Sequence, residues 1–213
     1  MKLHRYLTPD GRFDYARYRQ VQIEGNRRKL HARWVHRGTI DFLAGWLRDH
    51  VAPLRFGLCH GTRRGDEQAW FRDALGIEVI GTEISPTAAQ FPHTIQWDFH
   101  RVKPEWIEAV DFIYSNSYDH SFNPRRCFRA WASCLRVGGV MLLEHTRQHR
   151  PEATNAMDPF GIGRDELAAF LDHVGRGAFR VREVIADPPF QPAAHLEELS
   201  FVVVEKTQRM DGR

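Results

Sequence analysis

The sequence contains no apolar run that approaches the roughly 20 residues needed to cross a bilayer. Its first residues, MKLHRYLTPDG, have no hydrophobic segment of the kind found in secretory signals, so we expect no such signal. Only three cysteines are present, Cys59, Cys127 and Cys134, and their spacing is unlike that of any metal site. We therefore expect a cytoplasmic protein with free thiols and no metal site.

Lysine is also scarce, because only four of the 30 basic residues are lysines and the rest are arginines. An arginine bias has two interpretations: contacts with phosphate or nucleic acid, or simply codon composition. The 27 acidic residues are interspersed with the basic ones, which favours the second interpretation. The exception is residues 17–37, which are clearly basic. A small-molecule substrate is the expected partner, and nucleic acid is not.

The length and the alternation of patterns indicate one α/β domain. The chain has 213 residues, 42% of them hydrophobic, which is enough for a proper core. Residues 13–50 have apolar positions at three- and four-residue steps and predict two helices, with a break at Gly38-Thr39 and Thr39 as N-cap. Further on we expect strands over 54–60, 77–83, 93–99, 110–116, 140–146, 179–187 and 197–206, and helices over 66–76, 124–139 and 163–175.

The connection between the last two strands decides the topology. It contains the segment PPFQPAAHL, residues 188–196, with three prolines. A parallel crossover needs about a dozen residues and is usually helical, so this connector is too short and too rich in proline. The final strand should therefore run antiparallel beside its neighbour. The predicted fold is a doubly wound, seven-stranded, mainly parallel sheet with a reversed last strand, preceded by N-terminal helices.

Three segments at the expected strand ends resemble the class I S-adenosylmethionine-dependent methyltransferases. VIGTEIS is similar to the family's second strand, which ends in an acid, and here that acid is Glu83. IQWDFH is similar to the family's third strand. LRVGGVMLLEH resembles its leucine-basic-proline-glycine-glycine turn, with Val137 in place of proline. The resemblance covers about residues 54–206 and implies a Rossmann-like methyltransferase fold. It also implies that Glu83 accepts the ribose hydroxyls, that Asp98 accepts the adenine amino group and that Phe99 packs on the ring. Two other interpretations stay open: Glu83 as an acid at a helix N-terminus, and Asp98 as the cap of a turn.

The loop GLCHGTRRGDEQ resembles the family's first motif only in part. The family pattern is acid-x-Gly-x-Gly-x-Gly, and this chain has Gly57, Cys59, Gly61 and Arg63 at those positions. Arg63 has two open roles, pairing with the donor's carboxylate or pointing to solvent, whereas we expect Arg64 to point to solvent. The resemblance implies S-adenosylmethionine as cofactor, contacted by Cys59, His60, Gly61, Glu83, Ile84, Trp97, Asp98, Phe99, Ser115 and Ser117.

The fourth strand is followed by the polar run SNSYDHSFNP. Ligands of open α/β sheets bind beyond the carboxyl ends of the strands, so Tyr118, Asp119 and His120 are expected to face the transferred methyl group. His120 is a candidate general base because its ordinary pKa lies near neutrality, and the alternative is a hydrogen-bonded loop histidine. His145 is expected to order the long loop that follows it. The family's Asn/Asp-Pro-Pro-aromatic motif is missing, which argues against amide and exocyclic-amine substrates.

These patterns divide the chain into three parts. Residues 1–52 are predicted to form a helical cap or lid, residues 53–207 the methyltransferase-like domain and residues 208–213 a tail. The long loop at 146–162 should close the substrate site together with the N-terminal helices. The predicted function is methyl transfer to a small acceptor, with O-methylation and, because of the basic helix, an anionic acceptor favoured. The alternatives are a ligand-binding module without transferase activity and an RNA methyltransferase.

Overall fold

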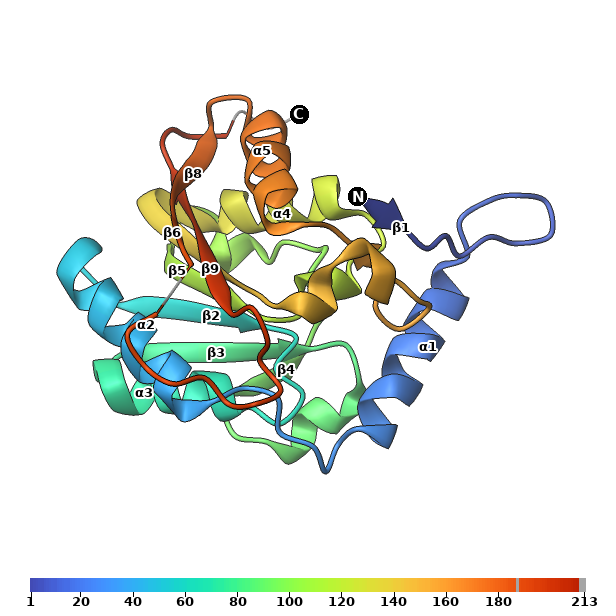
Figure 1. The fold of residues 1–213 in the computed structure, drawn as a ribbon, viewed down its shortest axis with the longest axis horizontal. Coiled ribbons are helices and arrows are strands. Elements are labelled where there is room, and N and C mark those ends of the chain that lie inside the picture. Colours follow the sequence, from blue (N-terminus) through green and yellow to red (C-terminus); the bar gives the residue numbers. More distant parts are fainter. Residues whose placement is uncertain (187, 211–213) are drawn as a thin grey trace.

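The computed structural model describes residues 1–186 and 188–210, so part of the predicted tail at 208–213 lies outside the described residues. Seven strands form one sheet in the order β4-β3-β2-β5-β6-β9-β8 (Figure 1). The last strand, β9, runs antiparallel to both β6 and β8, while the other pairs are parallel. The predicted fold class is confirmed. The strands are β2 (Phe56–His60), β3 (Glu78–Glu83), β4 (Thr94–Gln96), β5 (Val110–Ser115), β6 (Leu135–His145), β8 (Phe179–Ile185) and β9 (Ser200–Lys206).

Helices cover both faces of this sheet and give two apolar cores. One core packs α2 (Arg37–His50) and α3 (Asp66–Leu75) against the strands, and the other packs α4 (Pro124–Cys134) and α5 (Arg164–Gly175). Alternate residues of the buried strands point to opposite cores: in β6, Met141 and Leu143 face one core and Leu142 the other. The sheet is therefore a fixed platform whose strand ends position the loops.

The strand order places the topological switch point between β2 and β5, which are neighbours with connections leading in opposite directions. Ligands of open α/β sheets bind at this point, beyond the carboxyl ends of the strands. The helix α1 (Tyr15–Arg28) lies along this edge, beside the ends of β2 and β3 (Figure 1). Within residues 1–186 and 188–210, every helix is too short or too polar to cross a membrane.

Two short strands that the sequence did not predict join the N-terminus to the long loop. β1 (Lys2–Leu3) pairs antiparallel with β7 (Phe160–Gly161). The loop at 146–162 also contains 3₁₀ turns at Arg147–His149 and Pro151–Ala153, so it has a defined path. This pairing holds the loop close to the segment that leads into α1.

Two predicted helix boundaries are wrong. α2 begins at Arg37 with His36 as N-cap, and Thr39 is completely buried inside the helix, where its side chain faces the core and does not cap. The helix expected to reach Gly139 ends at Cys134, and the following residues already belong to β6. Gly139 belongs to the strand because it packs closely against β5. A Cβ atom at this position would lie 3.0 Å from the carbonyl oxygens of Val110 and Asp111.

A buried carboxyl group makes stability depend on pH. Glu144 of β6 is fully buried and accepts a hydrogen bond of 2.7 Å from the Tyr114 hydroxyl. Its second oxygen, Oε1, has no partner. Burial raises the pKa of Glu144 from 4.5 to about 7, with smaller opposing effects of Tyr114 and His149. Burial likewise raises the pKa of the neighbouring Glu67 to about 8. The folded protein thus holds protons that the unfolded chain releases.

We expect the free energy of unfolding to fall as pH rises from about 4.5 to about 7, because only the unfolded state loses the Glu144 proton in that window. One such group contributes at most about 1.4 kcal/mol per pH unit. Glu144→Gln should remove this contribution and make the pH profile measured by urea unfolding less steep, while the contribution of Glu67 remains. Glu78→Gln, at an exposed position of β3, is the control and should leave the slope unchanged. Parallel profiles for wild type and Glu144→Gln would contradict the assignment.

Candidate active site

Two adjoining cavities lie at the carboxyl edge of the sheet. The larger, of about 280 Å³, is bounded by the segment between α1 and α2, the loop after β2, the segment after β5 and the loop after β6. The smaller, of about 50 Å³, lies between α1 and the ends of β3 and β4. The two form one crevice because five residues line both: Lys29, Gly61, Arg63, Ser117 and His120.

The loop after β2 approaches the crevice with its backbone. Gly61 has a φ of +78°, and a Cβ atom there would lie 2.6 Å from the Cβ of Ser117, so only glycine fits. Packing also explains why position 57 carries glycine where the first motif has an acid. A Cβ atom at Gly57 would lie 2.3 Å from the ring of Phe112, which fills that space from β5. The loop therefore keeps close backbone approach but has no room for the acidic side chain.

Glu83 lies at the end of β3, the strand-end position that the sequence predicted, and lines the smaller cavity. Its side chain is buried, and its Oε1 accepts a hydrogen bond of 2.8 Å from the amide of Ser85. Burial raises the pKa of Glu83, and the positive charge of Arg63 acts in the opposite direction. Ile84 and Phe99 line the same cavity. The arrangement is a buried carboxylate beside an apolar slot.

Asp98 also lines the smaller cavity, but both of its oxygens already have partners. Oδ2 accepts a hydrogen bond of 2.8 Å from the hydroxyl of Tyr15, and Oδ1 contacts Nδ1 of His100 at 2.8 Å. Burial acts to raise the pKa of Asp98, but the hydrogen bonds and charge of His100, with Tyr15, lower it to about 2. Asp98 is therefore ionised and holds α1 through Tyr15.

Further contacts fix α1 over the crevice. Tyr18 donates to the carbonyl of His120 at 3.2 Å, and Gln22 donates through Nε2 to the carbonyl of Met157 at 2.9 Å. The Oε1 atom of Gln22 lies 2.6 Å from Nδ1 of His120. In this closed arrangement the smaller cavity, at about 50 Å³, has space for only one or two water molecules. A nucleoside would enter it only if α1 shifted outward.

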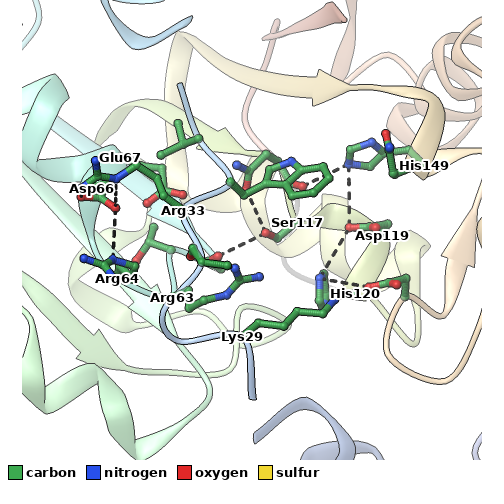
Figure 2. A pocket seen from close by; sticks show the side chains of 18 of the residues that line it. Lys29, Arg33, Arg63, Arg64, Asp66, Glu67, Ser117, Asp119, His120 and His149 are labelled. Carbon is green, nitrogen blue, oxygen red and sulfur yellow. Dashed lines mark hydrogen bonds and ion pairs between the residues drawn. The ribbon is translucent and has the colours of Figure 1, made fainter. Parts of the chain in front are cut away.

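Acids and histidines gather at one end of the larger cavity. Asp119 lies between the imidazoles of His120 and His149, with its Oδ1 4.0 Å and 3.9 Å from their Nε2 atoms (Figure 2). The same Nε2 of His120 lies 3.5 Å from Oδ1 of Asp158. Burial raises the pKa of Asp119 to about 7, against the attraction of His120. The cluster comes from two separate segments, the turn after β5 and the loop after β6.

Basic side chains line the rest of the larger cavity (Figure 2). Arg63 donates to the carbonyl of Ala32 at 3.3 Å and lines both cavities, so it does not simply point to solvent. The prediction for Arg64 is wrong, because its guanidinium lies near Asp66, at 3.6 Å, and donates to the carbonyl of Leu30. The basic side of the cavity also carries Asp66, which pairs with Arg33 and Arg64, and Glu67, whereas the opposite side carries Asp119 and Asp158.

The structure does not bring all predicted residues into the crevice. Tyr118 is buried, with its hydroxyl 2.6 Å from Nδ1 of His145, so it supports the turn from behind. Cys59 packs in the core with α3, and the Nδ1 atom of His60 lies 2.8 Å from the hydroxyl of Thr82. Neither Trp97 nor Ser115 lines the two cavities of the crevice: Trp97 donates to the carbonyl of Arg101, and Ser115 to that of His60.

Several residues that line the crevice were not predicted. Except for Glu67, in the first turn of α3, they come from segments that the sequence marked only as a basic helix and a long loop, which gave no reason to single out one position. Glu67 has an unpaired buried Oε2 atom and follows the glycine-poor loop directly. Asn116, expected at the mouth with Tyr118, Asp119 and His120, does line the larger cavity. The unpredicted residues include Gln22, Asn26, Lys29, Arg33, Glu67, His149 and Asp158.

Solved structures of other proteins share this architecture. No family model and no curated protein matches the chain. Among solved structures, Burkholderia thailandensis 1,6-didemethyltoxoflavin-N1-methyltransferase, with bound 1,6-didemethyltoxoflavin and S-adenosylhomocysteine, has a TM-score of 0.65 at 14% identity, covering 98% of this chain and 100% of that chain. Geranyl diphosphate C-methyltransferase from Streptomyces coelicolor has a TM-score of 0.58 at 13% identity, covering 78% and 77%.

The chain has the class I methyltransferase fold. The resemblance seen in the sequence is therefore confirmed for the fold. Identities of 13% and 14% show the fold alone. The [4+2]-cyclase SpnF also matches, with a TM-score of 0.58 at 13% identity, covering 79% of this chain and 81% of that chain. A methyltransferase fold thus accompanies more than one named reaction, and the activity has to be argued from the site.

Proposed function

We propose that the chain is an S-adenosylmethionine-dependent methyltransferase that binds its donor along the joined crevice. The observation that carries this proposal is Glu83, a buried carboxylate at the end of β3 in one cavity with Ile84 and Phe99, beside the Gly61 backbone. A carboxylate in this position accepts two ribose hydroxyls, and the apolar slot receives the adenine. The S-adenosylhomocysteine in the toxoflavin methyltransferase supports the same ligand class.

The amino-acid end of the donor would lie in the larger cavity. Arg63 lines both cavities and is placed to pair with the donor's carboxylate, which offsets its repulsion of the sulfonium. Glu67 lines the larger cavity with an unpaired oxygen and would accept a hydrogen bond from the donor's ammonium. In this proposal Glu67 compensates for the acid that Phe112 excludes from position 57.

The acceptor would occupy the remainder of the larger cavity. Lys29 lines it, together with Arg33 and Arg64, which share the single charge of Asp66, and this basic set supports a small anionic acceptor, such as a carboxylate or a phosphorylated metabolite. In the reaction an acceptor oxygen attacks the methyl carbon in line, the carbon–sulfur bond breaks and S-adenosylhomocysteine leaves as a neutral thioether. A hydroxyl acceptor must also lose its proton, and Asp119 and His120 lie where that group would be held. O-methylation of such an acceptor is the reaction we favour.

Calorimetric titration with S-adenosylmethionine and S-adenosylhomocysteine tests this proposal. We expect both to bind one per chain, followed by transfer of labelled methyl to a member of a panel of small carboxylates and phosphate esters. Absence of donor binding would contradict the proposal. Donor binding without transfer to any acceptor would instead favour a ligand-binding module.

Asp98 gives a prediction for the adenine end. Asp98→Asn should weaken donor binding about tenfold, because an amide presents an N–H group toward the adenine amine where a carboxylate accepts from it. Tyr15→Phe is the matched control: it removes the α1 contact to Asp98 but leaves the carboxylate, so donor affinity should not fall. Equal losses in both variants, measured by calorimetry, would assign Asp98 to holding α1 alone.

A further inference from the structure

Three side chains at the mouth of the larger cavity have the arrangement of an incomplete coordination shell. Oδ1 of Asp158 and of Asp119 lie 3.5 Å and 4.0 Å from Nε2 of His120. One ligand atom from each of the three lies within 4.8 Å of the others. Atoms bound at about 2.0–2.3 Å to one ion are themselves about 3–4.5 Å apart. Small rotations of the two carboxylates would bring all three onto a common centre.

His120 is held in the tautomer that a metal ligand needs. Gln22 donates through Nε2 to the carbonyl of Met157, so its Oε1 faces Nδ1 of His120, 2.6 Å away. Because Oε1 only accepts, Nδ1 carries the proton, and Nε2, which faces Asp119 and Asp158, is the nitrogen that offers a lone pair to a metal when the ring is neutral. A ring N–H that donates to an oxygen acceptor is the usual support of a metal-binding histidine.

Asp119 supplies an independent observation. The residue is only 7% exposed, and its Oδ1 atom has no hydrogen-bond partner. The imidazoles around it, at 3.9 Å and 4.0 Å, are too distant for hydrogen bonds. In the described part of the chain, every ion pair of Asp119 or Asp158 within 4.0 Å is to a histidine. A buried carboxylate oxygen without a partner is costly, and a cation at this point would satisfy it.

We propose that Asp119, His120 and Asp158 bind one divalent metal ion at the acceptor end of the crevice. Two carboxylate oxygens and one imidazole nitrogen suit Mn²⁺, Fe²⁺ or Zn²⁺ better than a soft ion, and the cavity side leaves coordination positions open. The ion's role rests on the proposed function: it would bind an acceptor oxygen and favour loss of its proton. Nε2 of His120 would then be a ligand and not a base.

The sequence predicted no metal site, because its three cysteines are few and their spacing is unlike that of any metal site. The present ligands come from the turn after β5 and from the loop after β6, which only the fold brings together. β7, which pairs with β1, follows Asp158 closely and holds this loop against the site. The three proposed ligands therefore come together only in the folded protein.

Mn²⁺ is the probe for the test, with chelator-treated full-length protein and no S-adenosylmethionine. Loss of the free Mn²⁺ electron paramagnetic resonance signal should show one saturable site per chain. The electron spin echo of bound Mn²⁺ should carry nitrogen modulation from the imidazole, and His120→Gln should abolish it. Asp158→Asn should weaken binding at least about tenfold, as expected for loss of a direct ligand.

Asp66→Asn is the matched control, because it removes the same charge from the same cavity at the end occupied by Arg33 and Arg64. It should leave Mn²⁺ affinity unchanged. Mn²⁺ should also raise the unfolding temperature of the wild type but not that of Asp158→Asn, whose unfolding temperature without metal shows whether it is folded. No saturable binding, no nitrogen modulation, or equal affinity in all variants would overturn the proposal. Donor titration is a separate measurement, so failure of the proposed function and failure of the metal site are distinguishable.

Discussion

His120→Ala is expected to lower kcat by about 10²-fold or more while changing donor affinity less than about twofold. The imidazole faces Asp119 and Asp158, so its loss removes the group that holds or ionises the acceptor. The contact of Tyr18 with this residue is to the backbone carbonyl and survives the substitution. Steady-state kinetics with the true acceptor and calorimetry with S-adenosylhomocysteine measure the two effects separately.

His173→Ala, at an exposed position of α5, serves as control and should change neither quantity. Loss of donor binding in His120→Ala would make the imidazole a donor ligand. An unchanged kcat would show that His120 is a hydrogen-bonded loop histidine, consistent with its contact to Gln22. Only a fall in kcat at nearly constant donor affinity fits a role at the reacting group.

Glu83→Ala should weaken donor binding by roughly 1.5–3 kcal/mol, which is about ten- to a hundredfold in Kd. The carboxylate is buried at the end of β3, so its hydrogen bonds to two ribose hydroxyls would be charge-assisted and shielded from water. Burial raises the pKa of Glu83 in the ligand-free protein, and ribose binding favours the ionised form. Calorimetric titration with S-adenosylhomocysteine measures the change.

Glu78→Ala, at the exposed start of the same strand, is the matched control and should bind the donor like the wild type. Circular dichroism establishes that each variant is folded. Unchanged affinity in a folded Glu83→Ala protein would refute the ribose assignment. It would leave Glu83 with its observed role, accepting the amide hydrogen bond of Ser85.

Much of the fold followed from local patterns, because strand periodicity and a proline-rich connector are local properties. The connector at 188–196 was enough to predict that β9 runs antiparallel, and strand ends were enough to find Glu83. Helix ends were less predictable. Gly139 marks close contact between two strands, which depends on β5, a segment distant in sequence.

The residues of the candidate site were predictable only where they follow a strand. Asp119 and His120 met that condition, and the structure places both at the larger cavity. Lys29 and Asp158 lie after a helix and within a long loop, and their positions depend on how α1 and that loop fold over the sheet. Tyr118 also follows a strand, but its side chain points into the interior and not into the cavity. Its hydroxyl contacts Nδ1 of His145, a contact that no sequence pattern indicated.

A crystal structure with S-adenosylhomocysteine tests the central claim most directly. We predict adenine against Ile84 and Phe99, ribose hydroxyls on Glu83, and the homocysteine sulfur pointing past Gly61 toward Asp119, with α1 displaced outward to admit the nucleoside. Density for the ligand along this crevice would support a methyltransferase site. Ligand bound elsewhere, or a crevice that stays closed at saturating ligand in a protein that binds it in solution, would contradict the assignment.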